Sequence, residues 1–414
     1  MDKIKALFST IIKSLVFFVY LYPVVLTVIP ITHTRNLMAC LGLILVFRQF
    51  GLRQFCRIWG RGLNLLFAFS VCILTSCLLN GTSDYSLLGL PITFLLTALA
   101  FYCVYIITGR PQLEEVTKYM AIACSIQAVI GLLFFLNPLF EEISYNFIKV
   151  NALAEEALLN SAGFRLHGLG ANFFSAGVTN CVVLALISIF VTTNQNLYVT
   201  CFIIITILGS CMSRTTMVGA AIVMPVLIYN LGLASKTKLL IVGGIVIITF
   251  SVIIAYAKNS ADERVFDLYN FGAELIINYE ESGSLRSSGV SALDYGSHMP
   301  QHFVTYFIGD GLYADPKNPT GAYYMGVDQG YLRMLYYVGL IGLMFRIFSN
   351  YTFVKTISLR RNSKQYYLLF IIYLVVMYKG DIDIFQFVAP CYLLSFKLMN
   401  NEKENSSSVC IRYI

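Results

Sequence analysis

The sequence predicts an all-α polytopic membrane protein with about twelve transmembrane helices, and its composition is the first reason. Of its 414 residues, 57% are hydrophobic and 12% are charged, with a mean hydropathy of +0.73. A typical soluble domain has roughly 45–50% apolar and about 25% charged residues. The chain is therefore too apolar for a soluble domain, and we expect a single integral membrane domain over residues 1–414.

The length of the apolar stretches is the second reason. A helix that crosses a bilayer core of about 30 Å needs roughly 20 apolar residues. The first stretch has a basic start, as a signal peptide does, but no small-residue cleavage site follows, so we expect a retained span. The candidate spans are 11–32, 36–47, 62–80, 87–108, 119–137, 172–193, 197–212, 215–233, 239–257, 329–348, 366–378 and 384–399.

The distribution of charge is the third reason, because lysines and arginines are retained in the short cytoplasmic loops of membrane proteins. With a cytoplasmic N-terminus, 19 of the 29 basic residues fall in inside segments, Arg346 among them, whereas 17 of the 22 acidic residues fall outside. The short outside loops hold only Arg35, Arg214 and Lys379. Both termini, including the polar tail at 400–414, are therefore predicted to be cytoplasmic. The net charge of +7 reflects topology, and nucleic-acid binding is not expected.

Two long segments, 138–171 and 258–328, are predicted to be outside loops, the second one large. Within the second, apolar and acidic residues alternate at helical spacing over 262–281, which predicts an amphipathic helix on the membrane face or over the spans. The stretch 138–159 is a weaker version of the same pattern, and a simple solvated helix is the alternative for both. No cysteine lies in an outside loop, so no disulfide framework is predicted there.

Three arginines are predicted to lie at the outer face: Arg165 before the sixth span, Arg214 between the seventh and eighth, and Arg286 in the large loop. An arginine inside the bilayer costs about 2.5–3.5 kcal/mol on insertion scales, so it is expected to face a cavity or a partner. The guanidinium group grips phosphate oxygens with two donors and stays charged. If the three arginines converge, they suit a pyrophosphate. Each alone would equally suit contact with lipid headgroups.

The histidines give weaker signals. His298 and His302 are four residues apart, the spacing of two metal ligands on one helix face, but Pro300 between them suits a first helical turn and would leave His298 outside the helix. No cysteine or carboxylate cluster completes a metal site, so no metal is predicted, and the pair is kept as candidate catalytic residues. His167, close to Arg165, is a candidate for hydrogen bonding to a phosphate or a sugar, with an ordinary polar loop histidine as the alternative.

Asp328 stands at the mouth of the tenth span and is the other candidate general base, able to accept a proton from a sugar hydroxyl. Pairing with Arg333 or Lys317 is the alternative. Tyr331 belongs to a group of nearby tyrosines that suits stacking on sugar rings, or an interfacial aromatic belt.

Asp381-Ile382-Asp383 matches the Asp-x-Asp pattern that holds a metal and a nucleotide diphosphate in many sugar-nucleotide transferases. The segment is predicted to lie outside, where nucleotide sugars are absent. We therefore expect the match to be accidental.

Several short motifs in a fixed order carry a family resemblance. They are Arg165-x-x-Gly168 with Asn172, Ser213-Arg214, Arg286 followed by Gly309-Asp310-Gly311, and Asp328-Gln329-Gly330-Tyr331 leading into Val338-Gly339-Leu340-Ile341-Gly342. With about twelve spans and a large late outer loop, the chain resembles the O-antigen polymerases of the Wzy type and their relatives, the O-antigen ligases. Ligases of this group usually carry a histidine where this chain has Asp328 and Gln329, which weakens the ligase interpretation.

The resemblance implies a GT-C-like fold in the bacterial inner membrane, periplasmic loops at 138–171 and 258–328, and a glycosyltransferase without a cofactor. Such a polymerase transfers the growing polysaccharide from undecaprenyl pyrophosphate to the non-reducing end of a lipid-linked repeat unit. The implied partners are the undecaprenyl-pyrophosphate-linked oligosaccharide, membrane lipid, and the chain-length regulator and flippase of the pathway.

Three alternatives remain open, and a purely structural membrane subunit is one of them. The other two are specific functions. One is an O-antigen ligase that transfers glycan to the lipid A core. The other is a lipid-linked oligosaccharide flippase or transporter, although the sequence shows none of the internal repeats common in transporters.

The predicted topology is tested by the reactivity of introduced cysteines. We expect cysteines placed near Asn80, Asn151 or Gly283 to react with a membrane-impermeant thiol reagent in cells with a permeable outer membrane, because these positions are predicted to be outside. Cysteines near Gly60 or Asn362 should not react. Labelling at Gly60 without labelling at Gly283 would invert the topology.

Overall fold

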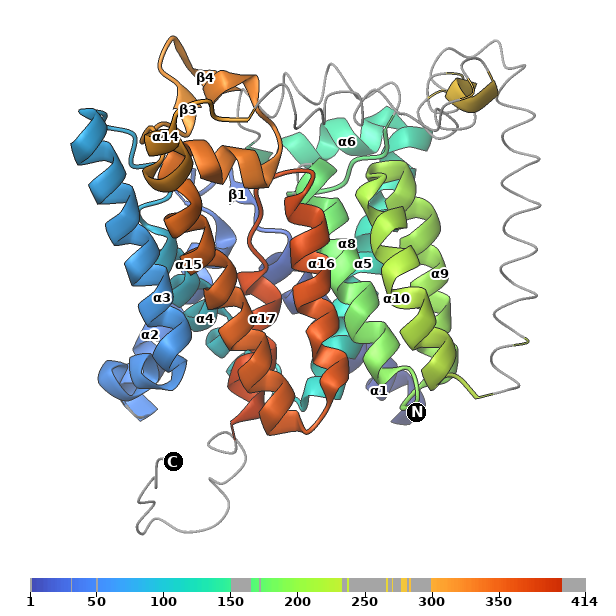
Figure 1. The fold of residues 1–414 in the computed structure, drawn as a ribbon. Helices are drawn as coiled ribbons and strands as arrows, with labels where there is room; N and C mark the ends of the chain where they lie inside the picture. Colours follow the sequence, from blue (N-terminus) through green and yellow to red (C-terminus); the bar gives the residue numbers. More distant parts are fainter. Residues whose placement is uncertain are drawn as a thin grey trace.

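The computed structural model describes residues 2–30, 32–49, 51–149, 165–170, 173–232, 237, 266, 270, 277–280, 283 and 299–396. These residues form a bundle of helices with two small antiparallel sheets at one end (Figure 1). The helices are α1 Asp2–Leu21, α2 Thr34–Gln49, α3 Leu52–Asn80, α4 Leu90–Ile107, α5 Leu113–Leu136, α6 Pro138–Tyr145, α8 Phe173–Phe190, α9 Gln195–Met212, α10 Thr215–Asn230, α14 Phe303–Ile308, α15 Gly330–Arg361, α16 Tyr367–Met377 and α17 Phe385–Ser395. The sheets pair β1 Val25–Leu26 with β2 Ile148–Lys149, and β3 Ala314–Asp315 with β4 Asn318–Tyr323.

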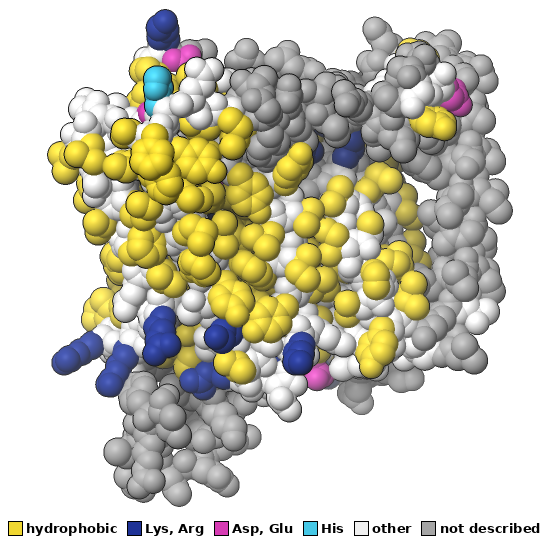
Figure 2. Space-filling view, viewed as in Figure 1, with side chains coloured by type: hydrophobic (Ala, Val, Ile, Leu, Met, Phe, Trp, Pro, Cys, Tyr) yellow, Lys and Arg dark blue, Asp and Glu magenta, His cyan; other side chains and the backbone are white. Residues whose placement is uncertain are grey.

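The apolar helices confirm an all-α membrane protein. Among the described residues, α3, α4, α5, α8, α9 and α15 are long and apolar enough to cross a membrane. Shorter apolar helices occupy Thr215–Asn230, Lys364–Met377 and Phe385–Ser395. Hydrophobic side chains cover the middle of the face seen in Figure 2, and lysines and arginines gather at its lower edge. The predicted ninth span, 239–257, lies outside the described residues.

The prediction of one span over 11–32 is wrong in its second half. Helix α1 ends at Leu21, and the chain enters strand β1, which pairs with β2 in the register Val25 to Lys149. Pro23 explains the ending, because the residue before a proline is disfavoured in the helical region. Residues 22–30 therefore lie at the end of the bundle near α6 and do not extend the first helix (Figure 1).

The predicted outer helices are described only in part. Helix α6 forms the start of the predicted helix at 138–159, with Leu139, Phe140 and Ile143 exposed. The predicted amphipathic helix at 262–281 lies almost entirely outside the described residues.

Aromatic packing joins four helices in the core. Trp59 of α3 is fully buried and stacks on Tyr392 of α17, with ring centroids 5.0 Å apart. Phe94 of α4 meets Trp59 edge-on at 4.9 Å and stacks on Phe353 of α15 at 4.6 Å. Such pairs contribute about 0.5–1.5 kcal/mol each beyond the area that they bury. The cluster holds α15 and α17 at a fixed distance from α3 and α4.

Helix α15 is broken at Gly339, which has φ 64°. A Cβ atom at this position would lie 2.2 Å from the carbonyl carbon of Phe307 in α14, so only glycine permits this close approach. The backbone groups at the break are hydrogen-bonded: the amide of Asp310 donates to the Tyr336 carbonyl at 2.6 Å, and Ser76 donates to the Tyr337 carbonyl at 3.0 Å. The break sets apart the first turns of α15, which carry site residues, from the part that crosses the bundle.

Candidate functional site

A cavity of about 510 Å³ opens where α8, α10 and α15 begin. This end of the bundle is opposite the start of α1 and the end of α17 (Figure 1). Its lining residues are Arg165, Phe173, Phe174, Ser213, Arg214, Tyr323, Asp328, Arg333, Lys379, Gly380 and Asp381. The cavity thus unites segments that are more than 200 residues apart in the sequence.

Side-chain charge, and not helix dipoles, makes the cavity electropositive. Three helices present N-termini to it, but α9 ends at Met212 and α16 at Met377, so opposing dipoles offset part of the field. Four cationic residues line the cavity against two carboxylates, which leaves a formal excess of two positive charges. An electropositive cavity of this kind favours a polyanionic ligand.

Lys379 lies among the arginines of the cavity. Its ammonium group is 3.3 Å from the Thr215 hydroxyl, at the start of α10. Burial lowers the pKa of Lys379, and the nearby charges of Arg165 and Arg214 lower it further, whereas Asp328 acts in the opposite direction. Arg165 and Arg214 therefore both act electrostatically on the ammonium group of Lys379. A bound anion would relieve this repulsion and favour the charged lysine.

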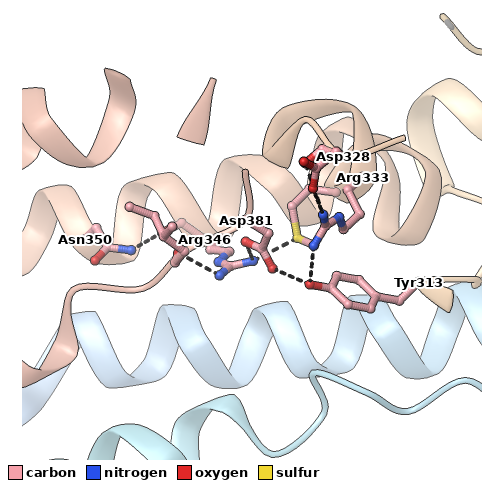
Figure 3. Close-up of polar contacts among 8 residues, drawn as sticks. Tyr313, Asp328, Arg333, Arg346, Asn350 and Asp381 are labelled. Carbon is pink, nitrogen blue, oxygen red and sulfur yellow. Dashed lines mark hydrogen bonds and ion pairs between the residues drawn. The ribbon is translucent and has the colours of Figure 1, made fainter. Parts of the chain in front are cut away.

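The two carboxylates are held by basic groups (Figure 3). Asp328 Oδ1 is 2.8 Å from Arg333 Nη2, and the Asp328 side chain keeps 71% of its surface exposed. Arg333 Nη1 donates to the Tyr313 hydroxyl at 3.0 Å, and this hydroxyl donates to Asp381 Oδ2, also at 3.0 Å. Asp381 Oδ1 is 2.6 Å from Arg346 Nη1.

Arg346, which the sequence counts among the basic residues of inside segments, is not a solvated charge. Its side chain is only 2% exposed and faces the interior of the bundle, where Nη2 also donates to the Ile382 carbonyl at 2.9 Å. Arg346 follows the break at Gly339 by seven residues, or about 10 Å of helix. Charge counting along the sequence did not reveal this burial because it treats every basic residue beside a span as solvated.

Asp84 fixes Tyr313 and the start of strand β3, which follows it. Its Oδ2 atom accepts hydrogen bonds from the amides of Tyr313 at 2.7 Å and Ala314 at 2.9 Å. Burial raises the pKa of Asp84, but hydrogen bonds from the Ser86 hydroxyl and from these amides outweigh it, so the pKa lies below its usual range. The ionised carboxylate therefore acts as an anchor for the hairpin beside the cavity.

The structure brings together three of the residues selected from the sequence, Arg165, Arg214 and Asp328, all of which line the cavity. The alternative noted for Asp328, pairing with Arg333, is realised. Arg286 and His298 lie outside the described residues.

The other three selected residues do not line the cavity. His167 is buried, and its Nε2 is 2.7 Å from Glu141 Oε1 of α6. Tyr331 donates to the Leu374 carbonyl at 2.6 Å. His302 is exposed and precedes the first turn of α14.

Sequence reasoning missed Lys379, Asp381, Arg333 and Tyr313 as members of the site. A signal existed for Asp381 and Lys379, since both lie between the last two predicted spans, where charge is costly. Arg333 had a local signal as a possible partner of Asp328, whereas the contacts of Tyr313 with Arg333 and Asp381 join separate segments and left none. In the part of the chain that the structure describes, no three histidine, cysteine or acidic residues are grouped to hold a metal ion.

Comparison of the sequence with protein-family models gave no match, and comparisons with curated proteins and with solved structures gave none either.

The buried pair leads to a stability prediction. Arg346→Met should lower the free energy of unfolding by about 3–5 kcal/mol, because it leaves the Asp381 carboxylate buried without its charge partner. Arg346→Met combined with Asp381→Leu should recover most of the loss, since replacing both charges removes the desolvation penalty. Thermal and denaturant unfolding in detergent would measure these changes in the free energy of unfolding. Lys355→Met, an exposed cation on the same helix, is the control and should change stability by less than about 0.5 kcal/mol. If Arg346→Met alone is as stable as the wild type, the buried ion pair does not stabilise the fold and the prediction is wrong.

Proposed function

We propose that this protein is a glycosyltransferase of the O-antigen polymerase type. It transfers growing polysaccharide from undecaprenyl pyrophosphate to the non-reducing end of a lipid-linked repeat unit, at the periplasmic face of the bacterial inner membrane. The observation that carries the proposal is the electropositive cavity, in which Arg165 and Arg214 stand together with the carboxylate of Asp328.

The cation set fits a lipid pyrophosphate leaving group. Arginine holds two phosphate oxygens at once through its planar fork, and Lys379 adds a compact point charge beside the two arginines. Neutralising the charge that develops on the leaving group is the kind of electrostatic stabilisation that contributes most to such reactions. Placement at the end of a membrane bundle also suits a substrate whose tail lies in the bilayer.

The reaction balances without a cofactor. Asp328 takes the proton from the acceptor hydroxyl as this oxygen bonds to the anomeric carbon of the donor sugar. The bond from that carbon to the pyrophosphate oxygen breaks, and its electron pair leaves with the lipid pyrophosphate, which Arg165 and Arg214 neutralise. Asp328 suits the task because its side chain is largely exposed in the cavity and, among the described residues, only Oδ1 has a side-chain partner. His302 is not among the residues that line the cavity.

The topology proposed with this function has twelve spans, both termini in the cytoplasm and the cavity facing the periplasm. The lysines and arginines at the end of the bundle opposite the cavity support this orientation, because basic residues mark the cytoplasmic side (Figure 2). The proposed partners are the lipid-linked repeat unit, membrane lipid, and the chain-length regulator and flippase of the pathway.

The cavity arginines give the first functional prediction. In a strain that lacks the native gene, Arg165→Ala and Arg214→Ala should abolish or severely reduce long-chain polymer on lipopolysaccharide gels, with normal protein levels in the membrane. Lysine at either position should rescue only in part, because it offers one point charge in place of a fork. Arg286→Ala is expected to behave in the same way if its segment contributes to the site.

The matched control is Arg53→Ala, an exposed arginine at the start of α3, which should give a normal ladder. Full-length polymer from both Arg165→Ala and Arg214→Ala would exclude the phosphate assignment. A strain without the protein that still makes long polymer on the lipid carrier but carries none on its lipid A core would point to the ligase alternative.

Asp328 gives the second prediction. Asp328→Asn keeps the shape of the side chain but loses its basicity, so turnover by purified protein should fall by about 10²–10⁴-fold while the lipid-linked repeat unit still binds. His302→Gln and His298→Gln should have little effect. The opposite pattern, with a silent Asp328→Asn, would transfer the role of base to a histidine. Activity that a chelator removes and a divalent ion restores would contradict the metal-free reaction.

A further inference from the structure

A chain of hydrogen bonds, with one ion pair at its buried end, runs from the interior of the bundle to the cavity (Figure 3). It begins at Arg346 and passes through Asp381, Tyr313 and Arg333 to Asp328, with each link between 2.6 and 3.0 Å. The five residues come from three separate parts of the sequence: the segment before β3, the stretch from Asp328 to the middle of α15, and the loop after α16. Basic and acidic groups alternate along it, with one tyrosine hydroxyl in the middle.

The hydroxyl of Tyr313 gives the chain a direction. It has one proton, which goes to Asp381 Oδ2, because the N–H group of Arg333 can only donate to its oxygen. The same hydroxyl therefore acts once as donor and once as acceptor. Neither a charged group nor an apolar side chain at this position would satisfy both neighbours.

Arg333 has little freedom to move. Nη1 donates to Tyr313, and Nη2 donates to the carbonyl oxygen and the carboxylate of Asp328. The plane of its guanidinium lies over the ring of Tyr323, with Cζ 3.3 Å from the ring centroid. Its position is thus set from several sides, and it in turn holds Asp328.

The Asp328–Arg333 pair would be weak alone. Its carboxylate is largely exposed, and exposed ion pairs contribute little to stability because solvent screens them and the side chains lose freedom. The far end of the chain is different, since Arg346 and Asp381 have side chains that are 2% and 4% exposed. Arg346 also bonds to Ile382, in the loop that carries Lys379 and Gly380 into the cavity.

We propose that Tyr313, Asp381 and Arg346 are positioning residues for the carboxylate of Asp328, and that the buried pair fixes the base through Tyr313 and Arg333. This inference rests on the proposed function, because it assigns Asp328 the role of base there. Tyr313 and Arg346 need not touch the substrate. They act through Arg333, which orients the carboxylate toward the acceptor hydroxyl.

Tyr313→Phe tests the chain directly, because it removes one oxygen and keeps the ring that packs against Tyr337 at 5.5 Å. With purified protein and lipid-linked repeat units, kcat should fall by about 10²-fold, the size of effect that a misplaced catalytic group can cause. The KM for the donor should stay within a factor of about two, since the pyrophosphate contacts remain. A loss of stability alone would instead reduce the amount of active protein and leave kcat per folded molecule unchanged.

Tyr337→Phe is the matched control. Its hydroxyl donates to the Asp84 carbonyl at 2.8 Å, so the variant also loses one tyrosine hydrogen bond in the same aromatic group, but not one in the chain. Its kcat should stay within about twofold of the wild type. Equal losses in Tyr313→Phe and Tyr337→Phe would overturn the inference.

The double variant Arg346→Met with Asp381→Leu separates positioning from stability. If the buried pair positions Asp328, the variant should reach normal levels in the membrane and still have a low kcat. Full activity would overturn the inference.

A structure of Tyr313→Phe in lipid nanodiscs provides a test that does not depend on activity. The 2.8 Å contact between Arg333 Nη2 and Asp328 Oδ1 should be lost or lengthened. If the wild type turns over no lipid-pyrophosphate donor, the proposed function fails. The structural comparison still decides the positioning role, because an unmoved Arg333 in the variant would overturn it.

Discussion

The buried ion pair between Arg346 and Asp381 is the interaction on which the site depends. An arginine at the centre of a membrane helix costs about 2.5–3.5 kcal/mol on insertion scales, and it is tolerated when it faces the protein interior and is paired. Here the guanidinium lies 2.6 Å from the carboxylate and also donates to the Ile382 carbonyl. Since Arg346 belongs to α15 and Asp381 to the loop before α17, the pair joins the last three helices at one point. The same loop carries Lys379 into the cavity. The buried Arg346–Asp381 pair therefore also helps to position Lys379.

Backbone geometry allows this pair to form beside a cavity. The break at Gly339 divides α15, so that Arg333 lies before the break and Arg346 after it. A continuous helix would place these two residues 13 positions, or about 20 Å, apart along one axis. Gly309 has φ 85°, and a Cβ atom there would lie 2.6 Å from the backbone of Tyr337, so α14 packs closely against the break. The Gly309-Asp310-Gly311 motif thus has a packing role next to the site.

The electrostatics of the cavity follow from the charges that line it. Asp328 pairs with Arg333, and Asp381 lies 2.6 Å from Arg346, which does not line the cavity; Arg165, Arg214 and Lys379 are the other charged residues of the lining. The downward shift in the pKa of Lys379 is the consequence, because burial and two nearby arginines disfavour a third cation. An anionic group in the cavity would reduce the repulsion. This balance is the physical basis for proposing a pyrophosphate carrier as the substrate.

The sequence by itself determined the membrane class and the positions of most apolar helices, and it singled out Arg165, Arg214 and Asp328, which line the cavity. These inferences depend on local properties: apolar length, and the cost of a charge next to a bilayer. Apolar length alone does not predict where a helix ends. The first helix ends at Leu21, shortly before Pro23, although the apolar stretch continues. Tertiary structure alone decided which charges meet. Arg346 had the local pattern of a cytoplasmic residue, and Asp381 that of an accidental motif, yet they form one buried pair from positions 35 residues apart. Tyr313 joined the site through contacts of the same kind, because its hydrogen bonds to Arg333 and Asp381 depend on the packing of whole helices.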